Sequence, residues 1–286
     1  MSEVKTMRYA AGVDVGSTQT KAVIMQDDGN EKKMIATALV DTGANVQKAG
    51  GNGFQAACKE AGIAPEQVGY VVGTGYGRYK IQFGNTQMTE ISCHARGAHF
   101  IFPNTRTVID MGGQDSKAIS IGPEGNVLDF VMNDKCAAGT GRFLANAADV
   151  LAMPLDYMGP FSLKGKNPVK ITTVCTVFVE SDILSYLAQG KKAEDVLSGV
   201  NLAIARRTVS LARRVPVEPA ITMTGGVARN VGMVKALEDV LGVKLQISPL
   251  AHFAGAIGAA LYALEKMDQA SEPGVQDGAH VANRGN

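Results

Sequence analysis

The sequence predicts an α/β protein that contains two copies of one strand unit. Each copy runs as an apolar strand, a glycine-bearing turn, a returning strand, a hairpin turn and a third strand, and the copies begin near residues 9 and 107. Helical patterns alternate with strands through most of the chain. Repetition at this spacing indicates duplication of a whole domain rather than a short-period solenoid.

In the first copy, residues 9–25 are expected to form strand, turn and strand, with small polar residues in the turn at 16–20. The stretch Asp28-Gly29-Asn30 is typical of a hairpin turn. The elements that follow are expected to be a strand over 34–40, a helix over 53–61, a buried strand over 68–72, and a helix over 89–97 that Thr89 caps.

The second copy repeats this plan and aligns with the first. A strand and turn over 107–114 precede a returning strand over 116–121, a hairpin turn over 123–126 and a third strand over 127–132. Asp14 and Asp110 each end an apolar strand beside glycine, and Lys21 and Lys117 follow them at the same offset of seven residues. The paired positions predict two similar sites that face one ligand.

The remainder is expected to be mainly helical. The predicted elements are a helix over 142–151, a loop or short helix over 155–162, a strand over 171–173, helices over 178–189 and 194–215, a strand over 220–224, a helix over 230–241, an edge strand over 245–247 and a final helix over 253–267.

Composition excludes several classes of protein. The formal net charge is +1 and the apolar fraction is 45%, so nothing indicates a nucleic-acid partner bound by bulk charge. No apolar run approaches the length of a membrane span, and residues 1–6 lack the pattern of a signal peptide. Four scattered cysteines do not form a disulfide framework. We expect a reduced, cytoplasmic protein with no membrane and no nucleic-acid partner.

Three glycine-bearing turns carry the predicted chemistry. They run from Asp14 to Lys21, from Asp110 to Lys117 and from Thr224 to Asn230. Glycine lets the backbone approach an anion closely, and consecutive exposed N–H groups form a nest for phosphate. The third turn begins a helix, whose N-terminus favours an anionic ligand. Together they predict a nucleotide clamp, although no P-loop motif is present and residues 73–77 lack the frame of a dinucleotide fold.

The order of these turns and the duplicated strands resemble the superfamily of acetate and sugar kinases, Hsp70 and actin (ASKHA). The resemblance implies two ribonuclease-H-like domains that close on Mg²⁺ and ATP or ADP. It implies that Asp14 and Asp110 organise Mg²⁺ and the attacking water, with Gln114 as a further catalytic residue. The nucleotide-binding residues that it implies are Gly12, Gly16, Ser17, Thr18, Thr20, Lys21, Gly112, Gly113, Asp115, Gly139, Thr140, Gly225, Gly226, Val227 and Asn230.

Six stretches resemble one family within that superfamily, the BadF/BadG/BcrA/BcrD-type ATPases. They are residues 74–78, 90–95, 109–115, 133–143, 173–180 and 223–228. This family includes the activators of 2-hydroxyacyl-CoA dehydratases and the ATPase subunits of ATP-dependent benzoyl-CoA reductase. The resemblance extends over nearly the whole chain, from residue 8 to residue 267. It implies a [4Fe–4S] cluster held between two subunits, with Cys136 and Cys175 as its ligands.

The number of cysteines is consistent with a shared cluster. A [4Fe–4S] cluster needs four thiolates, so a chain that offers Cys136 and Cys175 would share it across a homodimer or a pseudo-homodimer. Helix starts at these cysteines would direct positive helix ends toward an anionic cluster. Spacing alone favours two buried free thiols instead, and the family resemblance reverses that preference.

The remaining chemically active side chains receive ordinary interpretations. Cys58 and Cys93 are expected in the core, and Cys93 is not expected to act with its neighbour His94, because adjacent residues on a helix do not face each other. His99 and His252 have no predicted partner. The arginines at 206–207 and 213–214 are expected on an exposed helix face, with a docking patch for an acidic partner as the alternative.

The resemblance implies an anaerobic ATPase that takes an electron from ferredoxin or flavodoxin and passes it at low potential to a CoA-ester enzyme. Length and likeness favour the ATPase subunit of benzoyl-CoA reductase, with the activator of a 2-hydroxyacyl-CoA dehydratase as the alternative. A sugar-type kinase of the same superfamily is a more distant alternative, and a nucleotide-gated chaperone would need a further domain. The expected first domain is 1–106 completed by helix 252–267, the second is 107–251, and 268–286 is a disordered tail.

Overall fold

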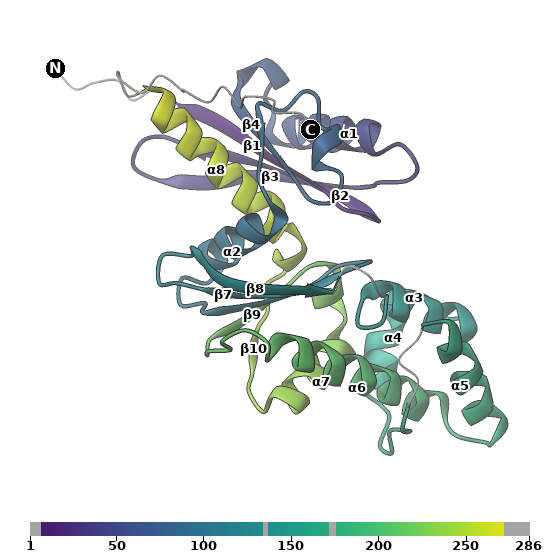
Figure 1. Ribbon diagram of the computed structural model, residues 1–286. Helices are drawn as coiled ribbons and strands as arrows, with labels where there is room; N and C mark the ends of the chain where they lie inside the picture. The colour runs from purple at the N-terminus through teal and green to yellow at the C-terminus, as the bar shows by residue number, and fades with distance from the viewer. Residues whose placement is uncertain (1–6, 134–136, 172–175, 272–286) are drawn as a thin grey trace, which may run out of the picture.

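The computed structural model describes residues 7–133, 137–171 and 176–271 of the chain. Two five-stranded sheets, each followed by helices, form its two halves (Figure 1). The first has the order β3-β2-β1-β4-β5 and the second has the order β10-β9-β6-β7-β8. The predicted duplication is therefore present as two sheets of the same size, in which the three strands of each repeat lie side by side.

The first sheet contains β1 (Arg8–Val15), β2 (Gln19–Asp27), β3 (Lys32–Asp41), β4 (Val68–Thr74) and β5 (Thr86–Gln87). The second contains β6 (Thr107–Met111), β7 (Ser116–Ile121), β8 (Val127–Asn133), β9 (Ile221–Thr224) and β10 (Leu245–Gln246). The helices are α1 (Val46–Ala61), α2 (Glu90–Ile101), α3 (Gly141–Val150), α4 (Leu155–Ser162), α5 (Thr176–Ala188), α6 (Ala193–Ala212), α7 (Val231–Leu241) and α8 (Ala254–Ser271).

Strand register confirms the predicted alignment of the two repeats. Asp14 pairs with Lys21 across the antiparallel β1–β2 ladder, and Asp110 pairs with Lys117 across β6–β7. Directly paired residues of an antiparallel ladder lie on the same face of a sheet. Each repeat therefore presents one carboxylate and one amine together at the end of its first strand.

Helix α1 begins seven residues earlier than predicted. Glycines at 50, 51 and 53 lower its intrinsic helix propensity, but the Asn45 side chain accepts a hydrogen bond from the N–H of Lys48 and caps its first turn. Gly53 faces the first sheet, where a Cβ would lie 3.2 Å from Cγ2 of Thr20. Close packing on the sheet therefore outweighs the local propensity.

The C-terminal helix continues beyond the predicted start of the tail at 268. Helix α8 ends at Ser271, and Asp268 pairs with Arg8 at 2.6 Å and with Lys32 at 3.8 Å. These contacts attach its last turn to the first sheet. The predicted strand over 171–173 is not formed at Ile171, and its other residues lie outside the described part of the chain.

Helices cover both faces of each sheet. Helix α8 packs on one face of the first sheet and α1 on the other, while α2 packs on one face of the second sheet and α6 packs against its other side. Helices α3 to α7 share one apolar core beside the second sheet. Since α8 lies against the first sheet, we propose that the first domain comprises the chain up to residue 106 together with this helix.

Helices α2 and α8 cross in close contact between the two sheets (Figure 1). A Cβ on Gly97 would lie 1.9 Å from the carbonyl oxygen of Ala254, and a Cβ on Gly258 would lie 1.9 Å from that of Cys93. An ion pair between Arg96 and Glu265 adds to the same contact. Only glycine permits so close an approach of the two backbones.

The crossing predicts a large stability effect at Gly258. Gly258→Ala should lower the free energy of unfolding by at least about 2 kcal/mol, because the new methyl group cannot fit without separating the helices. Gly51→Ala is the control: its Cβ would meet nothing within 4 Å, and it should raise stability by about 0.5–1 kcal/mol through helix propensity. Denaturant unfolding followed by circular dichroism measures both, and equal effects would contradict the role of the crossing.

Candidate functional site

Two buried carboxylates occupy equivalent positions in the two halves. Asp14 lies at the end of β1 with 6% of its surface exposed, and Asp110 lies near the end of β6 with 2% exposed. Both positions follow from apolar strands that bury all neighbouring side chains. Burial of a carboxylate costs free energy unless charges or hydrogen bonds compensate. The groups around each Asp therefore show which charges and hydrogen bonds compensate for its burial.

His94 of α2 lies between the two carboxylates. Its Nδ1 is 3.2 Å from Oδ1 of Asp110 and 3.1 Å from the hydroxyl of Thr224, which donates to the same Asp110 oxygen at 2.9 Å. A Cβ on Gly255 would lie 3.0 Å from both Nε2 of His94 and Oδ2 of Asp14. One nitrogen of the ring thus faces each half of the molecule.

Lys117 is a fully buried amine surrounded by three carboxylates. Its Nζ lies 2.9 Å from Asp115, 3.3 Å from Asp110 and 3.5 Å from Glu90. Burial alone would lower the pKa of Lys117, but these three carboxylates raise it above its ordinary value. Lys117 is therefore a permanent positive charge beneath the turn at 112–115.

The charges around Lys117 also determine the protonation of its neighbours. Burial would raise the pKa of Asp110, but His94, Lys117 and the hydrogen bond from Thr224 together lower it below its ordinary value. Burial raises the pKa of Glu90, with only partial compensation by Lys117. Asp110 is thus an ionised group with both oxygens engaged by the protein.

Asp14 has fewer partners than Asp110. Nζ of Lys21 lies 3.9 Å from its Oδ2 and donates instead to the carbonyl oxygen of Gln19 at 3.2 Å. A Cβ on Gly75 would lie 2.3 Å from the other oxygen of Asp14, so glycine is required there. Asp14 is the more available of the two carboxylates for a ligand.

The first two glycine turns, one from each half of the molecule, lie against each other. A Cβ on Gly113 would lie 2.6 Å from the hydroxyl of Thr18 and 3.4 Å from that of Ser17. Each turn is closed by one backbone hydrogen bond, from Gly16 to Gln19 and from Gly112 to Asp115. Both turns therefore line the same space.

The backbone donors of these turns fit a phosphate group. Within the described ranges, the N–H groups of Ser17, Thr18, Gly113 and Gln114 donate no hydrogen bond to the protein. Such free donors beside the Lys21 amine are what an anion nest needs. No three His, Cys, Asp or Glu side chains in that part of the chain form a ready metal site. Mg²⁺ would therefore rely on one or two carboxylates together with phosphate and water oxygens, which is its usual coordination.

The third turn lies beside the second carboxylate. Gly225 has φ +85, and a Cβ there would lie 2.7 Å from Oδ1 of Asp110. Gly226 is exposed, and a Cβ there would have no neighbour within 4 Å, which leaves room for a ligand. Val227 packs against Gly141. This arrangement brings the second and third turns together beside Asp110.

The turn at 138–141 is bonded to the second glycine turn. The N–H groups of Gly141 and Arg142 donate to the carbonyl oxygens of Gly112 and Gly113 at 2.9 and 2.8 Å. The Thr140 hydroxyl is fully buried and donates to Ala137 at 2.6 Å. Thr140 therefore stabilises this turn through its side chain.

Four further predicted ligand residues make structural contacts within the protein. Gly12 packs against α8, where a Cβ would lie 2.0 Å from the carbonyl oxygen of Ala256. The Thr20 hydroxyl is buried against that of Thr42 at 2.9 Å, and the Asn230 side chain caps α7 by accepting from Met233. Gly139 lies beside α6, with its Cβ position 3.6 Å from Cδ of Arg207.

The part that α2 plays in the site was not predicted from the sequence. Glu90 and His94 are four residues apart, so they lie on one helix face, and both face the charged cluster. The four-residue spacing of Glu90 and His94 could have indicated in the sequence that α2 contributes to the site. Cys93, by contrast, is in the core as expected, where burial raises the pKa of its thiol to about 12. Cys58 is also buried.

Two predictions lie outside the described residues. Cys136 and Cys175, the predicted cluster ligands, both fall in the ranges that the structure leaves out. Separately, no described helix combines the length and the hydrophobicity that a membrane span requires.

Sequence comparison identifies relatives of the chain. Residues 11–263 match the model of the BadF/BadG/BcrA/BcrD ATPase family. The activator of lactoyl-CoA dehydratase from Anaerotignum propionicum is 43% identical over 261 residues, which cover 90% of this chain and 98% of that protein. One of the subunits of benzoyl-CoA reductase from Thauera aromatica is 29% identical over 283 residues, which cover 96% of this chain and 100% of that protein.

Solved structures agree with these relatives. The (R)-2-hydroxyglutaryl-CoA dehydratase component A from Acidaminococcus fermentans superposes with a TM-score of 0.87 at 42% identity, covering 91% of this chain and 99% of that one. The activator of 2-hydroxyisocaproyl-CoA dehydratase from Clostridium difficile, with bound ADPNP, gives 0.85 at 38% identity, covering 94% and 99%. A ROK-family glucokinase from Streptomyces griseus gives 0.58 at 13% identity, covering 90% and 99%. The predicted actin, Hsp70 and sugar-kinase fold is confirmed.

The buried charge cluster predicts a strong effect of Lys117→Met. Loss of this amine leaves Asp110 and two further carboxylates without their shared counter-charge, so the free energy of unfolding should fall by about 3–5 kcal/mol. Lys235→Met, which removes an exposed i,i+4 pair with Asp239, should change it by less than about 0.5 kcal/mol. Chemical denaturation compares the two variants, and a mild effect at Lys117 would show that the cluster is not tightly coupled.

His252 lies near the first turn and has an unusual environment. Its Nδ1 is buried without a hydrogen-bond partner among the described residues, and its ring contacts Phe253. Burial, together with the charges of Arg229 and Lys21, lowers the pKa of His252 to about 4. The folded protein therefore holds this ring neutral at a pH where an unfolded chain would protonate it.

This environment predicts a pH-dependent stability. As pH falls from about 6.5 to about 4, only the unfolded chain binds the proton, so stability decreases over that window. His252→Phe should reduce the loss of unfolding free energy between about pH 7 and about pH 5 by about 1 kcal/mol. Denaturant titrations at both pH values test this, and identical losses in the two proteins would mean that His252 does not contribute.

Proposed function

The chain belongs to the BadF/BadG/BcrA/BcrD ATPase family, and we propose that it is the ATP-hydrolysing activator of a 2-hydroxyacyl-CoA dehydratase. The observation that carries this proposal is its identity to named activators, 38% over 98% of one and 43% over 98% of another. The related benzoyl-CoA reductase chain is only 29% identical. Identity therefore favours the dehydratase activator over the ATPase subunit of benzoyl-CoA reductase, which the sequence alone had favoured.

In this proposal the two facing turns bind the nucleotide phosphates. Free N–H groups of Ser17, Thr18, Gly113 and Gln114, with the Lys21 amine, support that role. The open space at Gly226 supports binding of the nucleoside beside the third turn. Phosphoryl transfer depends mainly on positioning and charge neutralisation, which this set of fixed donors can provide.

The two carboxylates have different roles in the proposed reaction. Asp110 is oriented on both oxygens by Thr224, His94 and Lys117, so it would act as a fixed negative charge that orders the attacking water. Asp14 has only a distant Lys21 and would hold the waters of Mg²⁺. Gln114, exposed on its turn, would contact the terminal phosphate. His94 would hold the carboxylates of Asp14 and Asp110 at a fixed distance from each other.

The electron-transfer half of the proposal rests on Cys136 and Cys175. We propose that they hold one [4Fe–4S] cluster across a dimer, and that the cluster supplies one-electron chemistry when bound. Ferredoxin or flavodoxin would supply the electron, and the dehydratase component would receive it. The hydrogen bonds from Gly141 and Arg142 to the second glycine turn support coupling, because the chain from Cys136 reaches the phosphate turn within six residues.

The decisive experiment is an anaerobic purification followed by three measurements. We expect about four irons per dimer, a brown chromophore and ATP hydrolysis without any sugar acceptor. Asp110→Asn should lower kcat for ATP hydrolysis by about 100-fold or more while iron content stays constant. The control Asp268→Asn, on the last turn of α8, should leave kcat within about twofold.

Partner choice can be tested with the same preparation. An ATP-dependent activation of a purified 2-hydroxyacyl-CoA dehydratase component supports the proposal, and activation of benzoyl-CoA reduction instead would reverse the preference. A colourless protein with sugar-stimulated hydrolysis would defeat both. Cys136→Ser that retains all iron would contradict the ligand assignment.

A further inference from the structure

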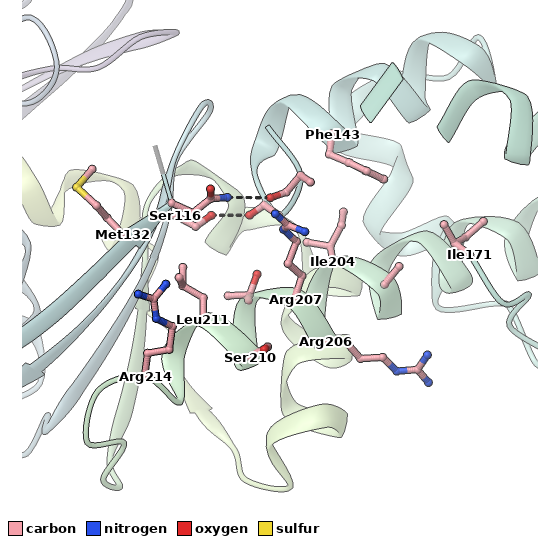
Figure 2. Close-up of a pocket in the computed structure, with 15 residues that line it drawn as sticks. Ser116, Met132, Phe143, Ile171, Ile204, Arg206, Arg207, Ser210, Leu211 and Arg214 are labelled. Atoms are coloured by element: carbon pink, nitrogen blue, oxygen red, sulfur yellow. Dashed lines mark hydrogen bonds between the residues drawn. The ribbon is translucent and has the colours of Figure 1, made fainter. Parts of the chain in front are cut away.

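A cavity of about 580 Å³ lies on the α6 side of the second sheet. Figure 2 shows its wall, which is formed by the ends of β7 and β8, the turn at 138–139, the start of α3 and one face of α6. Its volume is within the range of pockets that bind small molecules. Among the described residues of the three glycine turns, Ser116 of the second turn is the one that lines it.

The cavity contains a buried hydroxyl without a partner. Thr208 of α6 is 3% exposed, lines the cavity, and its Oγ1 makes no hydrogen bond among the described residues. A Cβ added to Gly139 would lie 3.7 Å from this oxygen, so the turn at 138–139 lies near it without supplying a bond. A buried hydroxyl without a bond costs free energy, which a ligand could recover by bonding to it.

Three arginines surround the same cavity. Arg206, Arg207 and Arg214 all line it. Among the described residues, none of these three arginines forms an ion pair, whereas Arg8 and Arg96 do. In Figure 2 the Arg207 side chain rises from α6 toward Ser116, while Arg206 and Arg214 lie at either end. Arg207 is partly buried. A guanidinium in such a position favours an anion, such as a carboxylate or phosphate, whose two oxygens can accept a pair of hydrogen bonds.

Apolar side chains complete the cavity. Phe143 and Ile204 line it and are almost fully buried, and Ile171 and Leu211 add further apolar wall. We infer that the cavity is a binding site for a small organic anion, whose phosphate or carboxylate pairs with Arg207 and whose apolar body packs against Phe143 and Ile204. Thr208 Oγ1 bonds to the same ligand.

A small molecule fits these observations better than a protein surface. A flat acidic protein could pair with exposed Arg206 and Arg214, but it could not enter the cavity to reach the buried hydroxyl of Thr208. Among the described residues, Ser116 is the one member of the three glycine turns that lines the cavity, and Gly139 is the one predicted nucleotide-binding residue that does. The site therefore lies beside the predicted nucleotide site rather than within it. The inference does not depend on the proposed activity, since it concerns binding alone.

The test uses the anaerobically purified holoprotein with its nucleotide cleft saturated by ADP and Mg²⁺. Anilinonaphthalene sulfonate, which joins an anionic group to an aromatic body, is the probe, and its fluorescence reports binding. We expect saturable binding to wild type, a loss of about tenfold or more in affinity for Arg207→Gln, and a loss of about fivefold for Thr208→Val.

A matched control lies on the same helix. Arg213 is exposed and does not line the cavity, so Arg213→Gln should change the affinity by less than about twofold. Thr208→Val should keep or raise the melting temperature, because it removes a hydroxyl that has no partner. Displacement of the probe by phenyl phosphate or by phenylacetate then distinguishes a phosphate ligand from a carboxylate ligand.

Several outcomes would overturn the inference. No saturable binding to the wild-type holoprotein would do so, as would equal losses for Arg213→Gln and Arg207→Gln, which would indicate general surface charge. Probe binding that occurs only after iron is stripped would assign the space to the cluster instead. A failure of ATP hydrolysis or of electron transfer, with these binding results intact, would affect only the proposed function.

Discussion

The crossing of α2 and α8 is the constraint on which the site depends. One helix packs on the second sheet and the other on the first, so their separation determines how the two strand ends face each other. Gly97 and Gly258 allow the backbones to touch. Cys93, whose carbonyl oxygen meets Gly258, immediately precedes His94, and Gly255 lies one turn from Gly258. The same contact that joins the sheets therefore places His94 between Asp14 and Asp110.

The duplication places an Asp and a Lys at equivalent positions in both halves, but the two pairs have different neighbours. Lys21 and Lys117 occupy the same register beside their aspartates. Lys117 is buried among three carboxylates, whereas Lys21 is 3.9 Å from one. The difference arises because α2 brings Glu90 and His94 against the second repeat and no equivalent described helix does so for the first. One half of the cleft is therefore a rigid charge cluster, and the other half keeps a freer carboxylate for a ligand.

The sequence predicted most elements and the positions of the three turns, because apolar periodicity and glycine placement are local features. The structural contacts that it did not predict have physical causes. Thr20 and Lys21 are adjacent in a strand, so they point to opposite faces of the sheet, and Thr20 meets Thr42 rather than Asp14. Gly12 was included for its place in a motif, but it is needed for the approach of α8. The start of α1 was missed because packing on the sheet outweighs the propensity of its glycines.

By itself the sequence determined the fold class, the duplication, the positions of the glycine turns and the family resemblance, all of which rest on short patterns that are visible along the chain. Only the tertiary structure decided which side chains act together. The contacts of His94 with Asp110 and Thr224 join residues 16 and 130 positions apart. Periodicity shows that a residue faces inward, but it does not show what it meets there. That depends on how two helices cross, and the crossing is set by backbone contact at two glycines.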